Sequence, residues 1–208
     1  MEEAMSQQFN IPVRSQNISA EGVNTPIAHH LTTVYNGYGS VLFDGYKLSM
    51  ETAAPQSADV THAALVASDV LYPRDNYSLQ YDARTVRQLR AVNPNPWEVA
   101  WFVPEYIDVD HAVVFLVKPN GWQLSMWDPT FPGGERFLST GDHHMAVDLK
   151  VRVSFQKSGN QLRVWVAALN LDVSAIIPPY GDGMQRGVVQ SALYCEDSSI
   201  ECTRWVSK

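Results

Sequence analysis

Apolar and polar residues alternate along most of the chain, which is the period of a β-strand with one buried face. In YSLQYDA (77–83) the odd-numbered positions are apolar and the even-numbered positions are mostly polar. VRVSFQ (151–156) and LRVWVAA (162–168) repeat this pattern. AVVFLV (112–117) is apolar throughout, so it predicts a central strand that is covered on both faces. Helical periodicity is nearly absent.

Turn sequences separate the predicted strands about every ten residues. They are rich in Gly, Pro, Asn and Asp, as in YPRDN, NPNP, KPNGW, DPTFPGGE, KSGNQ and PPYGDG. Many short strands at this spacing predict an all-β fold, an antiparallel β-sandwich or jelly roll. We expect one sandwich domain over residues 34–208, preceded by an N-terminal arm over residues 1–33 whose strand partners the sequence does not identify.

The charge of the chain narrows the choice of partners. The 208 residues carry a net charge of −7, and the fifteen Lys and Arg residues are scattered. We therefore expect no nucleic-acid partner, because no basic stripe is available to replace phosphate counterions. No apolar run approaches the roughly 20 residues that span a bilayer. The first residues, MEEAMSQQFNIPV, are acidic and polar, where a secretory signal would be basic and then apolar.

Cysteine and histidine spacing gives little sign of a metal site. Cys195 and Cys202 could form a disulfide, but two thiols in a chain of this size are more often simply buried. The DHH segment at 142–144 contains adjacent histidines, which on a strand point to opposite faces and cannot both reach one ion. We expect a polar turn there and no metal ligands.

A carboxylate stands inside an apolar stretch of PNPWEVAWFVPEY (94–106). On a strand, Glu98 would share a face with Ala100 and Phe102, and Trp101 would lie on the other face. If the tryptophan face is the core, Glu98 lies on the opposite surface, which in jelly rolls can be the concave, ligand-bearing one. Flanking aromatic residues would raise its pKa and suit it to general acid or base catalysis. The alternative is a salt bridge to a neighbouring arginine on a solvated face.

Three arginines and a lysine are candidate ligands for a negatively charged substrate. Strict alternation places Arg84 and Arg90 on one face of a strand and Arg87 on the other. Guanidinium groups bind carboxylate or sulfate through paired hydrogen bonds, and Lys118 would add a point charge. Ordinary ion pairs across an exposed strand explain the arginines equally well.

Histidine and tryptophan residues complete the candidate site. His111 opens the apolar strand that Lys118 closes, and it could transfer protons near neutral pH, as could His62. The alternative for both histidines is a structural hydrogen bond. Trp122 and Trp165 could stack on sugar rings, although core packing is the usual role of any single tryptophan. Six tryptophans in a small acidic β domain favour carbohydrate as the ligand.

Several segments together resemble one group of bacterial proteins. They are THAALV (61–66), RTVRQLR leading to NPWEVAW (84–101), DHAVVFLVKPNGWQL (110–124), DPTFPGGERFLSTG (128–141), LRVWV (162–166) and LYCEDSSIECTRW (193–205). This group has a concanavalin A-like, or laminin-G-like, jelly roll and is described as similar to glycoside hydrolase family sixteen or to keto-disaccharide hydrolase domains. The resemblance covers roughly residues 37–205, and it implies a polysaccharide partner and an extracellular or cell-surface location.

The chain departs from that group at two positions. Family-sixteen hydrolases carry carboxylates at alternating positions of one strand, whereas here Glu98 is followed by Ala100 and Phe102. Such jelly rolls often bind a structural calcium through an aspartate near the closing strand, and Thr203 stands at that position. We therefore expect no cofactor, with a structural calcium only as an alternative.

Three functions remain open from the sequence. The first is a glycan-cleaving enzyme, either a hydrolase or a uronic-acid lyase. Its residues would be Glu98 and His111 for acid–base catalysis and, for substrate binding, Arg84, Arg87, Lys118, Trp122 and Trp165. The second is a non-catalytic carbohydrate-binding module, and the third is a structural or surface-assembly protein. The missing second carboxylate favours elimination over hydrolysis, which usually needs two.

Overall fold

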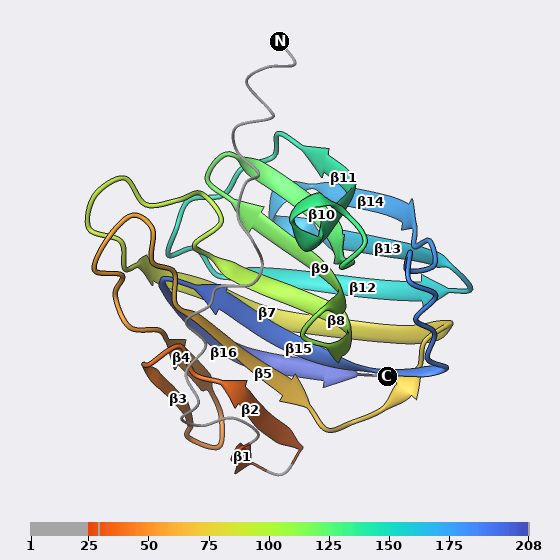
Figure 1. Ribbon diagram of the computed structural model, residues 1–208, viewed down its shortest axis with the longest axis horizontal. Helices are drawn as coiled ribbons and strands as arrows, with labels where there is room; N and C mark the ends of the chain where they lie inside the picture. Colours follow the sequence, from red (N-terminus) through yellow and green to blue (C-terminus); the bar gives the residue numbers. More distant parts are fainter. Residues whose placement is uncertain (1–24, 29, 208) are drawn as a thin grey trace.

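Two antiparallel β-sheets are stacked face to face in the computed structural model, which describes residues 25–28 and 30–207 (Figure 1). In spatial order, sheet A consists of β1 (Thr25–Ala28), β2 (Leu31–Tyr35), β5 (Ala63–Ser68), β15 (Val188–Glu196), β8 (Ala100–Asp108), β9 (His111–Lys118), β10 (Gly121–Trp127) and β11 (Glu135–Gly141), with β6 (Tyr72–Pro73) also paired to β15. Sheet B consists of β14 (Leu171–Ile176), β13 (Gln161–Val166), β12 (Val151–Ser158), β7 (Asn76–Gln88), β16 (Ser198–Ser207), β4 (Leu48–Glu51) and β3 (Ser40–Phe43). Two short 3₁₀ turns, η1 (Pro132–Gly134) and η2 (Ala167–Leu169), complete the described elements. The all-β sandwich expected from the sequence is confirmed.

The main core lies between the two sheets and follows the predicted alternation. The alternating apolar positions of β7 up to Ala83, those of β12, and Leu162, Val164 and Val166 of β13 belong to one buried cluster between the sheets. Tyr81, Phe115 and Phe155 form its aromatic centre, with ring centroids of Phe155 at 5.9 Å from Tyr81 and 6.0 Å from Phe115. Such edge-on contacts between fully buried rings contribute to packing beyond the area that they bury.

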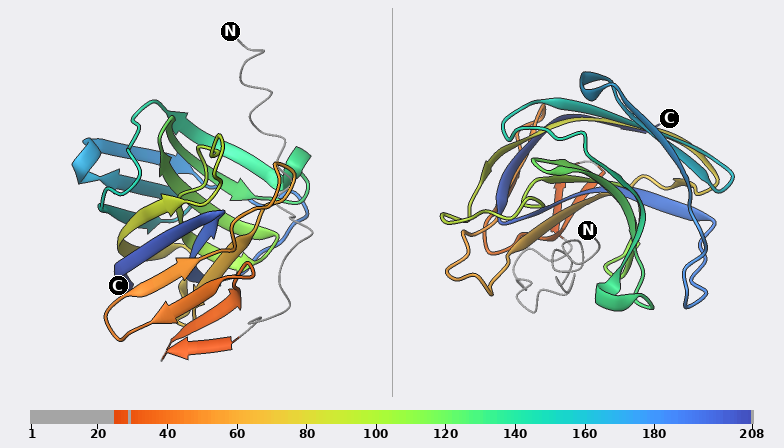
Figure 2. Two further views of the ribbon diagram at one scale, coloured as in Figure 1. Left: turned by 90° about the vertical axis from the view of Figure 1, so that its left-hand side faces the viewer. Right: turned by 90° about the horizontal axis from the view of Figure 1, so that it is seen from above.

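A second buried cluster lies on the other face of sheet A. Figure 2 shows that sheet A is curved and that its concave face is turned away from sheet B. Trp101, Leu116, Trp127 and Tyr194 are buried on this concave face. Every residue of β9 is buried, as predicted for a strand covered on both faces.

The sequence suggests that the tryptophan face of β8 packs into the main core. The structure shows the opposite orientation. Ala100 and Phe102 enter the core between the sheets, whereas Trp101 and Val103 belong to the concave-face cluster. Both faces of this strand are apolar and buried, so alternation identifies two faces without showing which one meets the second sheet.

Some residues of the predicted N-terminal arm pair with sheet A. β2 pairs with β5, and β1 pairs with β2, so residues from 25 onward extend sheet A at its edge. Residues 1–24 of the predicted arm lie outside the described residues. Cys195 and Cys202 are both buried free thiols, in agreement with the favoured interpretation of their spacing.

Candidate functional site

Polar side chains from four strands meet on the concave face of sheet A. Gln123 and Ser125 share a face of β10 with Trp127, which lies in the concave-face cluster, because residues two apart on a strand point the same way. Glu135 pairs with Trp127 across β10 and β11, and Glu196 lies two residues after Tyr194 on β15. Lys118 ends β9 on the same face. We call Lys118, Gln123, Ser125, Glu135, Tyr194 and Glu196 the concave polar cluster.

Hydrogen bonds join one half of the concave polar cluster into a chain. Nζ of Lys118 donates to Oε1 of Gln123 at 2.7 Å, and Nε2 of Gln123 donates to Oε1 of Glu135 at 3.0 Å. Oγ of Ser125 donates to the same Glu135 oxygen at 2.5 Å. These contacts fix the rotamers of four side chains that come from three adjacent strands.

Glu196 is the most strongly perturbed carboxyl group of the cluster. It is only 4% exposed, and burial raises its pKa to about 7. The hydroxyl of Tyr194 donates to Oε1 and opposes this rise, whereas the negative charges of Asp197, Glu135 and Glu98 add to it. Glu196 therefore exchanges its proton close to neutral pH, which is the property of an efficient general acid or base.

The pKa values of Lys118 and Glu135 are shifted in the directions that favour the neutral form of each group. Burial lowers the pKa of Lys118, and the nearby charge of Glu135 limits this effect. Burial raises the pKa of Glu135, while hydrogen bonds from Ser125 and Gln123 and the charge of Lys118 act against it. Three titratable groups with shifted pKa values on one sheet face are typical of a functional site.

Aromatic rings lie beside the concave polar cluster. The ring of Tyr194 is 5.2 Å from those of Trp101 and Trp127, measured between centroids. Nε1 of Trp101 donates to the backbone oxygen of Trp97 at 2.8 Å, but Nε1 of Trp127 is buried without a partner, and so is Oε2 of Glu196. Buried polar atoms without partners are costly, and these two lie on the same face as the concave polar cluster.

The outer edge of this site is formed by β11, whose residues are mostly half-buried. Glu135 lies on this strand, whereas Glu196 and Tyr194 lie deeper, near the middle of sheet A. The site therefore combines partly accessible and buried acid–base groups. It can donate protons, accept protons and hydrogen-bond to hydroxyl groups.

Glu98 lies just before β8 in a buried ion-pair network. Its Oε1 accepts from Nε of Arg90 at 2.7 Å and from Nδ2 of Asn95 at 2.9 Å, and its Oε2 is buried without a partner. Arg90 also donates to Asp197 at 2.7 Å and to the backbone oxygen of Val60. Burial raises the pKa of Glu98, with the bond from Arg90 opposing it. The network joins three loops at one end of sheet A.

Arg84 and Arg87 lie on the outer face of sheet B and share that face, contrary to strict alternation. β16 pairs Glu201 with Arg84 and Ser199 with Arg87, and a bulge between these pairs leaves Val86 as an extra residue on β7. An extra residue reverses the direction of every side chain that follows it.

Both of these arginines are engaged in ion pairs. Arg84 contacts Glu201 and Asp148, each at 3.0 Å, and Arg87 contacts Glu51 at 2.9 Å. Arg90 lies beyond the end of β7 and takes part in the Glu98 network instead. The structure therefore separates Arg90 from Arg84 and Arg87, and it places none of the three in the concave polar cluster.

His111 lies at the opposite end of β8 from Glu98. Its Nδ1 is 2.7 Å from Oδ1 of Asp108 and its Nε2 is 2.9 Å from Oδ2 of Asp182. Ten residues separate Glu98 from Asp108, a span of roughly 30 Å in an extended strand. Glu98 and His111 cannot serve the same reaction centre, and a catalytic role for either one stays a prediction.

The two predicted stacking tryptophans have different surroundings. Trp122 is buried in the core between the sheets, and its Nε1 has no partner there. Trp165 is half-buried on the outer face of sheet B, where the guanidinium of Arg163 lies 5.6 Å from its ring centroid. It lines a cavity of about 340 Å³ with Gln80 and Gln156. Among the seven predicted site residues, only Lys118 belongs to the concave polar cluster.

The sequence pattern does not single out Gln123, Ser125, Glu135, Tyr194 and Glu196. A weak signal is present, because WQLSMW and ALYCE alternate in the same way as the predicted strands. Within the described residues, no group of three or more His, Cys, Asp or Glu side chains is placed to hold a metal ion. No helix in this part of the chain is long and apolar enough to cross a membrane.

Scans of the sequence against protein families and against curated proteins found no match. Solved structures with the same fold include the carbohydrate-binding module CBM66 from Bacillus subtilis, with 10% identity, a TM-score of 0.62, and coverage of 88% of this chain and 99% of that one. Winged bean acidic lectin, complexed with methyl-α-D-galactose, has 9% identity, a TM-score of 0.57, and coverage of 86% and 92%. Bacillus licheniformis β-glucanase has 10% identity, a TM-score of 0.54, and coverage of 90% and 95%. At these identities the likeness shows the fold alone, a jelly-roll sandwich of the concanavalin A-like kind.

Proposed function

We propose that this protein cleaves polysaccharides on the concave face of sheet A, with Glu196 as the general acid. The observation that carries this proposal is the concave polar cluster, in which a buried carboxyl group with a pKa of about 7 lies beside two tryptophans and a second, half-buried carboxyl group with a raised pKa. Shifted pKa values of this kind cluster at sites of acid–base catalysis. The polysaccharide- and sugar-related names of proteins with this fold agree with the substrate class.

In this proposal the two carboxyl groups have separate roles. Protonated Glu196 gives its proton to the glycosidic oxygen as the bond to the sugar breaks. Glu135, held by Ser125 and Gln123, acts as the carboxylate that activates water or attacks the sugar carbon. This assignment supplies the second carboxylate that the stretch around Glu98 does not provide.

Lys118 and the aromatic residues would bind the substrate. The amine of Lys118 lies next to Gln123 and would contact a sugar hydroxyl or a uronic acid carboxylate. Trp127 would donate from Nε1, its unpartnered atom, to a sugar oxygen. If the substrate is a polyuronate, the same groups can perform an elimination: Glu135 removes the ring proton beside the carboxylate, Lys118 neutralises that carboxylate, and Glu196 protonates the glycosidic oxygen as its bond to the sugar ring breaks and a ring double bond forms. A polysaccharide substrate would also fit an extracellular or cell-surface location.

The test is incubation of the purified protein with neutral, uronic and sulfated polysaccharides. New reducing ends indicate hydrolysis, and absorbance of an unsaturated uronate indicates elimination. The variant Glu196→Gln should lose turnover on any substrate that responds, whereas Glu51→Gln, which alters an exposed carboxylate paired with Arg87, should keep it. Full turnover by Glu196→Gln overturns the assignment of the general acid.

A non-catalytic carbohydrate-binding module is the second candidate. The unpartnered Nε1 of Trp127 favours it, because a binding site also uses such donors. Retention of a polysaccharide in a gel without any cleavage product would support this candidate over the enzyme.

A further inference from the structure

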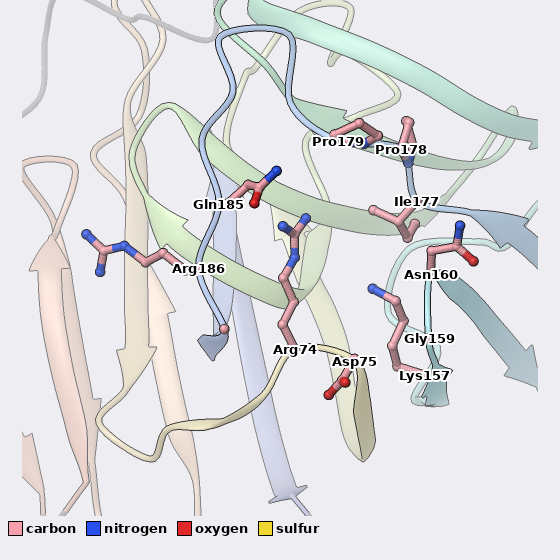
Figure 3. A pocket seen from close by; sticks show the side chains of 11 residues that line it. Arg74, Asp75, Lys157, Gly159, Asn160, Ile177, Pro178, Pro179, Gln185 and Arg186 are labelled. Carbon is pink, nitrogen blue, oxygen red and sulfur yellow. The ribbon is translucent and has the colours of Figure 1, made fainter.

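A basic cavity of about 650 Å³ lies at the far end of β15 from Glu196 (Figure 3). Its walls come from the β6–β7 turn with Arg74, the β12–β13 turn with Asn160, and the loop of residues 177–187 between β14 and β15. This volume is within the range of small-molecule sites. The cavity is separate from the concave polar cluster, so the proposed function does not use it.

The three walls are joined by backbone hydrogen bonds. The amide of Arg74 donates to the oxygen of Gly187 at 3.0 Å, and the amide of Gly159 donates to the oxygen of Asp75 at 2.7 Å. The amide of Ile177 donates to the oxygen of Asn160 at 2.8 Å. The cavity is thus built into the fold and does not depend on contacts between mobile side-chain ends.

Two cations share one buried carboxylate beside this cavity. Nε of Arg74 donates to Oε2 of Glu105 at 2.8 Å, and Nζ of Lys157 donates to Oε1, which also accepts from the hydroxyl of Tyr77. Arg74 and Lys157 are both in contact with Glu105, and a second carboxylate, Asp75, also lines the cavity and acts on Lys157 from a longer range. Burial lowers the pKa of Lys157; the charge of Glu105 and the hydrogen bond to it limit this effect, whereas the charge of Arg74 adds to it.

The donors of Arg74 that do not contact Glu105 remain available. Within the described residues, its two Nη groups have no hydrogen-bond partner, and its side chain is 17% exposed. The guanidinium lies 5.1 Å from the ring centroid of Tyr180, which orients it. In Figure 3 the charged ends of Arg74 and Lys157 lie on either side of the same space, with the amide of Gln185 near Arg74, whereas Arg186 points away.

We infer that this cavity binds the carboxylate or sulfate group of an acidic saccharide. The free Nη donors of Arg74 suit the paired oxygens of such a group, and the amine of Lys157 lies across the same space as a second cationic group. The amides of Asn160 and Gln185 offer donors and acceptors for hydroxyl groups, and Ile177, Pro178 and Pro179 supply an apolar wall for the sugar ring. A site made only for an inorganic anion would need neither the volume nor this wall.

The test is calorimetric titration of the full chain with a galacturonate trisaccharide, a sulfated disaccharide, the neutral counterparts and inorganic sulfate. The two acidic sugars should bind, and their affinity should fall with added salt. The neutral sugars should not bind at this site, and inorganic sulfate should bind more weakly than either acidic sugar. Equal affinity for inorganic sulfate overturns the saccharide assignment, and failure of every anion to bind overturns the site.

Variants locate the binding and separate it from the concave face. Gln185→Glu places a negative charge at the exposed wall and should weaken binding about tenfold, as expected for like charges at short range. Gln156→Glu, on the exposed outer face of β12, is the matched control and should bind as the unaltered protein does. Glu196→Gln should also bind normally, so loss of binding in that variant alone contradicts the location. An unchanged affinity for Gln185→Glu contradicts it as well.

Discussion

Tyr194 and Glu196 lie two residues apart on β15, and the phenol of Tyr194 donates a hydrogen bond to Oε1 of Glu196. The other oxygen of Glu196 is buried without a partner. The carboxyl group of Glu196 is thus buried, is oriented by Tyr194 and keeps one oxygen, Oε2, without a hydrogen-bond partner. This combination is costly for a fold and useful for a reaction, which is why the proposed chemistry centres on Glu196.

The stability of the protein should depend on pH through Glu196. Its pKa rises from 4.5 to about 7 on folding, so the folded state binds the proton more tightly than the unfolded state. The contribution of this group to the free energy of unfolding is therefore greatest below pH 4.5. It falls by about 3 kcal/mol in total as the pH rises from 4.5 through 7. Urea unfolding at pH 5 and pH 8 measures this fall in the unaltered protein and in Glu196→Gln. The difference in unfolding free energy between the two pH values should be smaller in the variant, and an equal difference in both proteins would contradict the raised pKa of Glu196.

Glu105 should be essential for stability. Glu105→Gln removes the counter-charge of both Arg74 and Lys157 in a buried setting and should lower the free energy of unfolding by about 3–5 kcal/mol. Glu51→Gln breaks the exposed pair with Arg87 and should cost less than about 1 kcal/mol. Chemical denaturation of the two variants compares them directly, and equal losses would show that the buried network is not a net requirement of the fold.

His111 should titrate above the ordinary value for histidine. Burial lowers its pKa, but hydrogen bonds to Asp108 and Asp182 outweigh burial and raise it above 6.5. The contribution of this contact to stability is complete below pH 6.5 and is lost as the pH rises through the raised pKa. NMR titration of the imidazole should show this pKa, and Asp182→Asn should lower it. A value at or below 6.5 in the unaltered protein contradicts the contact geometry.

Phe155 should mark the centre of the main core. It is fully buried against Tyr81 and Phe115, so Phe155→Ala should cost about 3–5 kcal/mol through lost contacts and a residual cavity. Thermal unfolding followed by circular dichroism measures this loss. Val41→Ala, at the half-buried edge of the same core, should cost clearly less, and a similar loss for both would argue against the packing described.

The sandwich was predictable because each strand carries its own alternation. β7, β12 and β13 need only their local pattern to show which side chains are buried. The orientation of β8 was not predictable, because its two faces are both apolar and only pairing with β9 and β15 decides which face meets sheet B. The placement of Arg87 depended on a bulge, and a single extra residue leaves no clear mark in the sequence.

The concave polar cluster was hidden for a related reason. Lys118 was recognised because it ends an apolar strand, but its partners come from segments that are far away along the chain. Glu196 joins them only because β15 inserts between β5 and β8 in sheet A. Local pattern shows that a residue faces one side of a sheet, and only the strand order shows which residues share that side.

The pH–rate profile of polysaccharide cleavage tests the central claim most directly. With Glu196 as the general acid, kcat/KM on a responsive polysaccharide should fall as the pH rises above about 7, because the proton that the acid must donate is lost. Glu196→Gln should reduce kcat by about 10²–10⁴-fold and abolish that limb of the profile. An unaltered alkaline limb and near-normal kcat in Glu196→Gln would contradict the claim and assign the chemistry to another group.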